Sequence, residues 1–498
     1  MAYPFARAAC TLSMDGAPAD TVDSANWCYT VSRLAFVPDG EIAERCNAKG
    51  FDMADYDQRQ GERPRADISK QPEPVLRGTP ITPERYYSKD FMAREWDKIW
   101  TRTWQIAGLE RELLNKGDYI TTTLGHETIL CTRGNDGEVR AFFNVCQHRG
   151  MQLMAEPSGQ VRQLVCPYHG WAYDLAGTLR TVPDEADYPQ GSPCGKLNLV
   201  EMPCEIWGGF VWYNMDPACV PLRTYLGPIA DQIDSYPMAE MVRTHWVTIE
   251  GDFNWKLVQD NFSESYHVPF VHPGSKFVIE YGRHHCQFDH FPEGHCRMFM
   301  PGAGPADTVK GGENQTLEIM AEELKRWELN PDDYRGGKTR DIRLDLQRQK
   351  RKLGVDKGFD FSTYHDDQLT DNWHYTIFPN LSFSLKPDGN IWLRARPHES
   401  DPEKCYFDMW YMTLFPKGET HYYSQIMRER VSIDTPAQHV QGRASEVSAG
   451  PAIDEDVAIW VGQQRGLHSR GYRRDYLAGQ ESRMRYFHET LEDWLARD

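Results

Sequence analysis

Two short segments combine cysteine and histidine at spacings that suit a bound metal. The first reads Cys146-Gln-His148 and the second reads Cys166-Pro-Tyr-His169, with 17 residues between them. Two thiolates and two imidazoles suit a tetrahedral zinc ion. They equally suit a two-iron, two-sulfur cluster in which two histidines replace two cysteines on one iron. The ligand types alone leave both metals open.

A second group of candidate ligands lies in the segment NWKLVQDNFSESYHVPFVHP, residues 254–273. Its apolar spacing predicts a helix over about 254–268. On such a helix Asn261, Glu264 and His267 are three residues apart and lie close to one face.

Pro269 is expected to end or kink that helix, so that His272 turns back toward His267. Two histidines and one carboxylate around one face of an octahedron form the ligand set of non-haem Fe(II) oxygenases. This arrangement leaves coordination positions open for dioxygen and substrate. The segment therefore predicts two of three iron ligands.

The residues around the cysteine motifs favour iron over zinc. CQHRG at 146–150 and CPYHGWAYDLAGTL at 166–179 resemble the Rieske signature almost residue for residue. The resemblance implies that Cys146 and Cys166 hold one iron of a [2Fe-2S] cluster, and that His148 and His169 hold the other. The extra cysteine that respiratory Rieske proteins carry in each loop is replaced here, which favours the oxygenase branch.

The second segment resembles the iron signature of the Rieske non-haem iron oxygenases. In that family an acid precedes the first histidine ligand by three residues and bridges the two metal centres. The resemblance implies that Glu264 links His267 to the partner subunit's His169. Many ring-dihydroxylating members have Asp here, with one extra residue after the asparagine that Asn261 matches. Asp260 is a lesser candidate for the bridge.

The third iron ligand is expected far along the chain. DEDVAIWVGQQRGL resembles the family's C-terminal signature, in which an Asp precedes the Gln of Gln-Arg-Gly-Leu by eight residues; this implies Asp456. Asp456 also lies beside a predicted apolar helix stripe, and a buried carboxylate is costly unless it is paired or metal-bound. Asp454 and Glu455 are expected to be ordinary first-turn acids favoured by the helix dipole.

A cluster of further histidines repeats the spacing of the iron motif without its acid. It comprises His284, His285, His290 and His295. We expect these residues to be hydrogen-bonded or to line a pocket rather than to bind the catalytic metal.

The elements that must position these residues fall into four stretches. We predict an N-terminal extension (1–75), a helix (76–100) and an all-β region (101–222). A mixed region (223–498) follows, and its last part from 454 is helical again. The resemblance implies an α+β chain: an all-β Rieske [2Fe-2S] domain and a helix-grip catalytic domain of antiparallel sheet and helices.

The resemblance also implies partners. Electrons would cross between subunits of a homotrimer, with or without an added β subunit. No Gly-rich dinucleotide fingerprint opens a βαβ unit. A separate NAD(P)H-dependent reductase, with or without a ferredoxin, is therefore expected to supply electrons for dioxygen. The aromatic residues expected to line the substrate pocket favour a small apolar substrate. We expect hydroxylation of an aromatic or polycyclic compound. The alternative is monooxygenation of an alkyl, N-methyl or O-methyl group, ending in demethylation.

Composition limits the other classes. The formal charge of −18 disfavours nucleic-acid binding, and the sequence has no apolar run of membrane-spanning length. A cytoplasmic protein is expected, whose 12 cysteines are thiols or metal ligands. An electron-transfer protein with only the cluster leaves the second ligand set unexplained. A zinc scaffold protein would be colourless.

Overall fold

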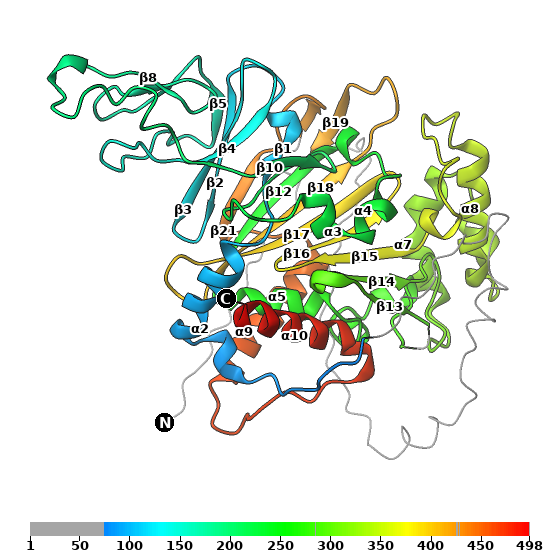
Figure 1. Ribbon diagram of the computed structural model, residues 1–498. Coiled ribbons are helices and arrows are strands. Elements are labelled where there is room, and N and C mark those ends of the chain that lie inside the picture. The colour runs from blue at the N-terminus through cyan, green and yellow to red at the C-terminus, as the bar shows by residue number, and fades with distance from the viewer. Residues whose placement is uncertain (1–73, 284, 425–426, 428, 498) are drawn as a thin grey trace, which may run out of the picture. The chain divides into compact units, whose positions relative to one another are not determined.

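The computed structural model describes residues 74–283, 285–424, 427 and 429–497 (Figure 1). The extension predicted for 1–75 therefore lies outside the described residues, apart from its last two positions. Within the described ranges, no helix combines the length and apolar character needed to cross a bilayer.

The segment predicted as one helix over 76–100 forms three short helical pieces instead. These are η2 (Pro83–Tyr86), α2 (Lys89–Glu95) and the π-helical η3 (Trp96–Trp100). The break occurs because Tyr87 leaves the helical region and Ser88 starts a new helix, its Oγ accepting from Phe91 N at 3.3 Å.

Strands β1 to β11 form the all-β region. The long strands β2, β3 and β4 pair antiparallel within a sheet of order β5-β2-β3-β4-β9, and the sheets β1-β11-β10 and β6-β7-β8 complete the region. The strands are β1 Gln105–Leu109, β2 Asp118–Leu124, β3 Glu127–Arg133, β4 Val139–Phe143, β5 Ser158–Gln160, β6 Leu164–Val165, β7 Ala172–Tyr173, β8 Leu179–Thr181, β9 Glu201–Met202, β10 Cys204–Trp207 and β11 Phe210–Tyr213.

One large sheet organises the rest of the chain, in the order β13-β14-β15-β16-β17-β18-β12-β21. Its pairs are antiparallel except β12 with β21, which run parallel. Most of the domain separates β12 from β21 in sequence. They are therefore not joined by a tight hairpin, which would force antiparallel pairing. The strands are β12 Val242–Gly251, β13 Gln287–His290, β14 Cys296–Met300, β15 Asn372–Ile377, β16 Leu381–Lys386, β17 Gly389–Pro397, β18 Cys405–Thr413 and β21 His439–Arg443, beside the separate hairpin β19 His421–Ser424 and β20 Glu429–Ser432.

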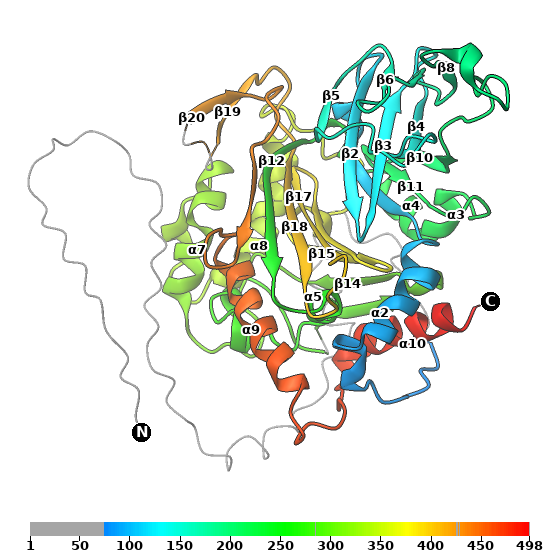
Figure 2. The ribbon, with the colours of Figure 1, turned by 90° about the vertical axis from the view of Figure 1, so that its left-hand side faces the viewer.

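Helices gather at one end of this sheet, where α5, α9 and α10 lie near one another in both views (Figures 1 and 2). Helix α5 contacts β16, β17 and β18, which is the helix-grip arrangement that the family resemblance implied. The helices are α3 Leu222–Leu226, α4 Pro228–Ile233, α5 Trp255–Phe262, α6 Val268–Val271, α7 Glu313–Arg326, α8 Ile342–Leu353, α9 Pro451–Leu467 and α10 Ser482–Ala496. The predicted fold class is confirmed.

Candidate active site and metal centres

The two cysteine motifs form a pair of similar loops. The backbone N–H of Gly150 donates to Cys146 O, and that of Gly170 donates to Cys166 O, each at 3.0 Å. Both glycines have positive φ, 75° and 69°, which favours a residue without Cβ. Each loop thus closes a turn over its cysteine, and both cysteines are buried thiols.

The four side chains converge between these loops. The rings of His148 and His169 lie 4.7 Å apart, and His148 stacks on Trp171 at the same distance. The Nδ1 atom of His148 is buried and has no hydrogen-bond partner in the described chain. Tyr173 Oη lies 3.4 Å from Cys146 Sγ, where a hydroxyl can stabilise a cluster thiolate. This donor set fits a two-cysteine, two-histidine cluster.

The helix predicted over 254–268 is shorter than expected. It ends at Phe262, with Ser263 as its C-cap, so Glu264 and His267 lie beyond it rather than on its face. Pro269 does not end this helix; it stands in the first turn of α6. Proline suits that position because the missing N–H would have no partner there.

Three side chains nevertheless meet at one point. The ligand-type atoms of His267, His272 and Asp456, hereafter the metal triad, all lie within 4.8 Å of one another. Asp456 Oδ1 lies 2.9 Å from His272 Nε2 and 3.7 Å from His267 Nε2. That oxygen is buried and has no well-aligned hydrogen-bond donor. The arrangement fits a shared cation better than a hydrogen-bonded pair.

The other nitrogen of each imidazole meets a second carboxylate. Glu264 Oε1 lies 2.6 Å from His267 Nδ1, and Glu455 Oε2 lies 2.8 Å from His272 Nδ1. Such contacts fix the ring orientation of a metal-binding histidine and raise its basicity. Glu455 was expected to be an ordinary first-turn acid, and that expectation is wrong. Its position in a run of three acids gave no local signal of this contact.

Negative charge dominates the metal triad. Burial lowers the pKa of His272, but Asp456 and Glu455 outweigh it and raise the pKa above its usual value. The carboxylates of Asp456 and Glu455 beside these mostly buried imidazoles create a negative potential that a divalent cation would satisfy. The residues present therefore fit a mononuclear iron.

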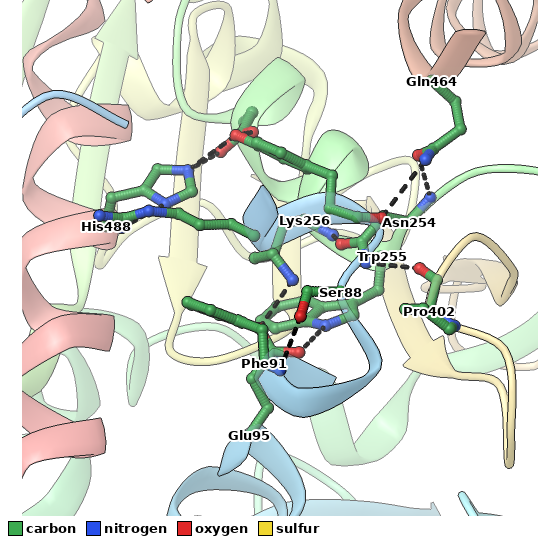
Figure 3. A network of polar contacts seen from close by, with 12 residues as sticks. Ser88, Phe91, Glu95, Asn254, Trp255, Lys256, Pro402, Gln464 and His488 are labelled. Carbon is green, nitrogen blue, oxygen red and sulfur yellow. Dashed lines mark hydrogen bonds and ion pairs between the residues drawn. The ribbon is translucent and has the colours of Figure 1, made fainter. Parts of the chain in front are cut away.

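A polar network holds α9 against α5 and so sets the position of Asp456 (Figure 3). Gln464 Oε1 accepts from Asn254 N at 2.9 Å, and Asn254 caps α5 through Lys256 N. Gln464 lies two turns after Asp456 on α9. Gln464 thus contacts the start of α5, while Asp456, eight residues earlier on α9, reaches the metal triad beyond the end of α5.

The two remaining candidates near Glu264 are placed differently. Asp260 accepts from Tyr86 Oη at 2.7 Å and lies 2.9 Å from His488 Nε2, so it belongs to a buried network away from His267. Asn261 keeps a buried Nδ2 atom without a hydrogen-bond partner in the described chain.

The histidines of the cluster at 284–295 are not part of the metal triad. His295 Nε2 donates to Tyr225 O at 2.8 Å and its Nδ1 accepts from Phe378 N at 3.0 Å, which confirms the expectation of a hydrogen-bonded histidine. His290 packs on Tyr486. His285 lies 3.5 Å from Asp307, and both are grouped with Glu280. His284 lies outside the described residues.

A small β domain with a two-cysteine, two-histidine loop pair, followed by a helix-grip domain with a 2-His-1-carboxylate group, defines the class of Rieske oxygenases. Two family models match the chain: the Rieske [2Fe-2S] domain at residues 103–197 and the ring hydroxylating alpha subunit (catalytic domain) at residues 238–497. The chain therefore belongs to the family of ring-hydroxylating alpha subunits. Domains of these two kinds carry a [2Fe-2S] cluster and a mononuclear iron.

Individual relatives have diverse substrates. The chain is 34% identical to the chloroplastic choline monooxygenase of Atriplex hortensis over 199 residues, 38% of this chain and 44% of that protein. It is 32% identical to the benzene 1,2-dioxygenase alpha subunit of Pseudomonas putida over 195 residues, 38% of this chain and 43% of that protein. The matched stretch thus spans under half of each relative's length.

The fold is shared more widely than the sequence. A quaternary ammonium Rieske monooxygenase in complex with L-carnitine superimposes with a TM-score of 0.59 at 20% identity, covering 86% of this chain and 99% of that one.

Proposed function

We propose that this chain is a terminal oxygenase component. It would use dioxygen and electrons from NAD(P)H, delivered by a separate reductase with or without a ferredoxin, to oxidise a small organic substrate. The observation that carries the proposal is the metal triad, in which three potential ligands from two distant segments meet around a buried carboxylate oxygen. An electron carrier with the cluster alone has no need of it.

The chain's own residues have separable tasks. Cys146, Cys166, His148 and His169 would hold the cluster, and the metal triad would hold Fe(II), which supplies dioxygen activation when bound. Glu264 and Glu455 would orient the two imidazoles through their Nδ1 atoms. Glu264 would also link His267 to the cluster that supplies electrons to the iron.

The positions of the two centres support electron transfer between subunits. The sheet β6-β7-β8, which flanks the second cysteine loop, lies far from α9 in both views (Figures 1 and 2). A cyclic homotrimer, with or without an added β subunit, would bring the partner subunit's His169 to Glu264. A solved structure of a quaternary ammonium Rieske monooxygenase gives insight into inter-subunit electron transfer in that protein, which supports the arrangement.

Two substrate classes fit the family. Hydroxylation of an aromatic or polycyclic compound corresponds to the benzene dioxygenase relative. The alternative is monooxygenation of an N-methyl, O-methyl or alkyl group, ending in demethylation. The relatives that are monooxygenases of choline and carnitine, both non-aromatic compounds, support monooxygenation.

One experiment tests oxygenation and separates the two classes. Iron-loaded protein, a surrogate reductase and labelled dioxygen are incubated with a panel of arenes and methylated amines, and products are identified by mass spectrometry. We expect either two labelled oxygens in an arene diol or loss of one methyl group as formaldehyde. Protein that is colourless and contains stoichiometric zinc would contradict the proposal, as would a reducible cluster that oxidises no panel member.

A further inference from the structure

Solvent-accessible arginines gather around the connection between α9 and α10, in a chain whose formal charge is −18. None of them forms an ion pair with a carboxylate of the described residues. Like charges held close together repel one another, and a surface of opposite charge on a partner relieves that repulsion. The members, hereafter the arginine patch, are Arg283, Arg470, Arg473, Arg474 and Arg485.

The acids inside this surface do not neutralise it. Asp475 Oδ1 accepts a hydrogen bond from Ile81 N at 2.7 Å, and Glu481 Oε2 accepts one from Ala478 N. Both carboxylates thus hold the backbone of the connection in place. Arg474 and Arg485 line a hollow of about 280 Å³ on this surface, so the two guanidinium groups lie close to one another.

Glu264 lies next to the arginine patch. Burial raises the pKa of Glu481, and the nearby charge of Glu264 raises it further, whereas Arg485 lowers it. The three charged groups are therefore neighbours. Arg283 lies against Gly479, where its Nη1 atom occupies the space that a Cβ would take. The arginine patch thus borders the place to which the proposed function brings the partner subunit's His169.

Exposed aromatic rings lie beside the same place. Tyr266 is exposed next to His267, and Phe270, on the short helix α6, is 79% exposed. Large apolar side chains that cluster on a surface mark a site of contact with another molecule. The surface around Glu264 therefore combines aromatic groups with a cationic edge.

An acidic segment lies beside the second cysteine loop. It is fixed to this loop at both ends: Pro183 packs on Gly170, and Tyr188 Oη accepts from Trp171 Nε1 at 3.0 Å. Its carboxylates are exposed and form no ion pair with the described part of the chain. The members, hereafter the acidic segment, are Asp184, Glu185 and Asp187.

The surface around His169 resembles the surface around Glu264 in layout and opposes it in charge. Tyr168 is exposed, and its ring lies 3.7 Å from the ring of His169. The acidic segment supplies the charged edge. An apolar centre with a polar rim is the usual make-up of a protein interface. Two different surfaces that fit one another in this way form a head-to-tail contact, which closes into a ring.

We propose that the arginine patch binds the acidic segment of a neighbouring copy and so holds the partner subunit's His169 against Glu264. This inference rests on the proposed function and identifies the surfaces that form its electron-transfer contact. The opposite charges would fix the register in which the copies associate, and the exposed aromatic rings would supply buried apolar area. A separate electron carrier with an acidic surface is the competing occupant of the arginine patch.

Charge reversal tests the contact through the mass of the oligomer. The double variant Arg473→Glu, Arg474→Glu should raise the concentration of half-dissociation at least about tenfold, because like charges then face one another. Asp184→Lys, Asp187→Lys should do the same. All four changes in one chain should restore association, because opposite charges meet again. Sedimentation velocity of the iron-loaded protein over a dilution series gives the measurement.

A matched control separates this effect from a general change in charge. Lys338→Glu, Lys352→Glu reverses two exposed cations that form no ion pair with the described chain, and its oligomer should dissociate as the wild type does. The midpoint of thermal unfolding should be similar for all variants at a concentration where they are associated, which shows that each chain folds.

The inference is wrong if either double reversal leaves dissociation unchanged, or if the fourfold variant associates no better than the double variants. An arginine reversal that slows cluster reduction by an external donor and leaves the oligomer intact would assign the patch to that donor instead. An oligomer that behaves as expected but oxidises no compound would overturn the proposed function alone. Oxidation by an oligomer insensitive to both reversals would overturn only this inference.

Discussion

At the scale of single residues, Asp456 is expected to determine whether the chain holds its mononuclear iron. Asp456→Ala should remove about one iron per chain, because two imidazoles alone bind Fe(II) weakly and the carboxylate supplies both charge and the third ligand. Oxygen-dependent product should vanish, while the visible cluster spectrum in the same variant should persist. Iron analysis and absorbance check both outcomes. Full iron occupancy in this variant would move the ligand role to another acid.

Glu264 is expected to couple the two centres without binding either metal. Glu264→Gln should leave both loaded but slow turnover by at least about a hundredfold, because Gln places a donor where His267 Nδ1 needs an acceptor. Single-turnover reoxidation of the reduced cluster, with substrate and oxygen present, measures this step. Glu481→Gln serves as control, since it removes a nearby charge without touching His267. Unchanged reoxidation in Glu264→Gln would rule out the bridge.

Glu455 is expected to strengthen the second histidine ligand. Glu455→Gln should weaken iron binding about tenfold, near the low end for such contacts, because 44% of the Glu455 side chain is exposed. Iron retention during dialysis against a chelator gives the measurement. Asp454→Asn is a matched control, since Asp454 accepts from Ala449 N and touches no histidine. Equal iron loss from both variants would contradict the role of Glu455.

At the level of elements, a buried ion pair joins α2 to α5. Lys256 Nζ lies 2.7 Å from Glu95 Oε1, and both side chains are at most 2% exposed (Figure 3). Lys256→Met should destabilise the fold by about 3–5 kcal/mol, because Glu95 is left buried without a counter-charge. The midpoint of thermal unfolding reports the loss.

Two comparisons make that prediction specific. The double variant Glu95→Leu, Lys256→Met should recover much of the stability, since neither charge remains buried. Lys325→Ala, which breaks an exposed pair with Glu322 on α7, should cost less than about 1 kcal/mol. A double variant less stable than Lys256→Met would mean that the pair acts through packing rather than charge.

For the whole molecule, the proposed route of electrons predicts complementation between defective subunits. Cys146→Ala chains should lack the cluster, and Asp456→Ala chains should lack the iron. Co-expressed with different tags and isolated as mixed oligomers, they should recover activity, because one subunit's cluster serves its neighbour's iron. Each variant alone should be inactive. Mixed oligomers without activity would favour transfer within one chain.

Much of this architecture could be predicted from the sequence because its signals are local. The cysteine loops and the alternating strands depend on residues within a few positions of one another, and the family resemblance supplied the helix-grip fold. The boundaries of helices were less accurate. Ser88 and Ser263 begin or end helices through cap geometry that spacing alone does not reveal.

The sequence by itself determined which residue types could bind two metal centres and in what order along the chain. Only the tertiary structure placed Asp456 against His267 and His272, because Gln464 and Asn254 must first hold α9 on α5. It likewise gave Glu455 a histidine partner. Most of the arginine patch lies far from Glu264 in sequence, so only the packing of the folded chain could bring it beside that carboxylate.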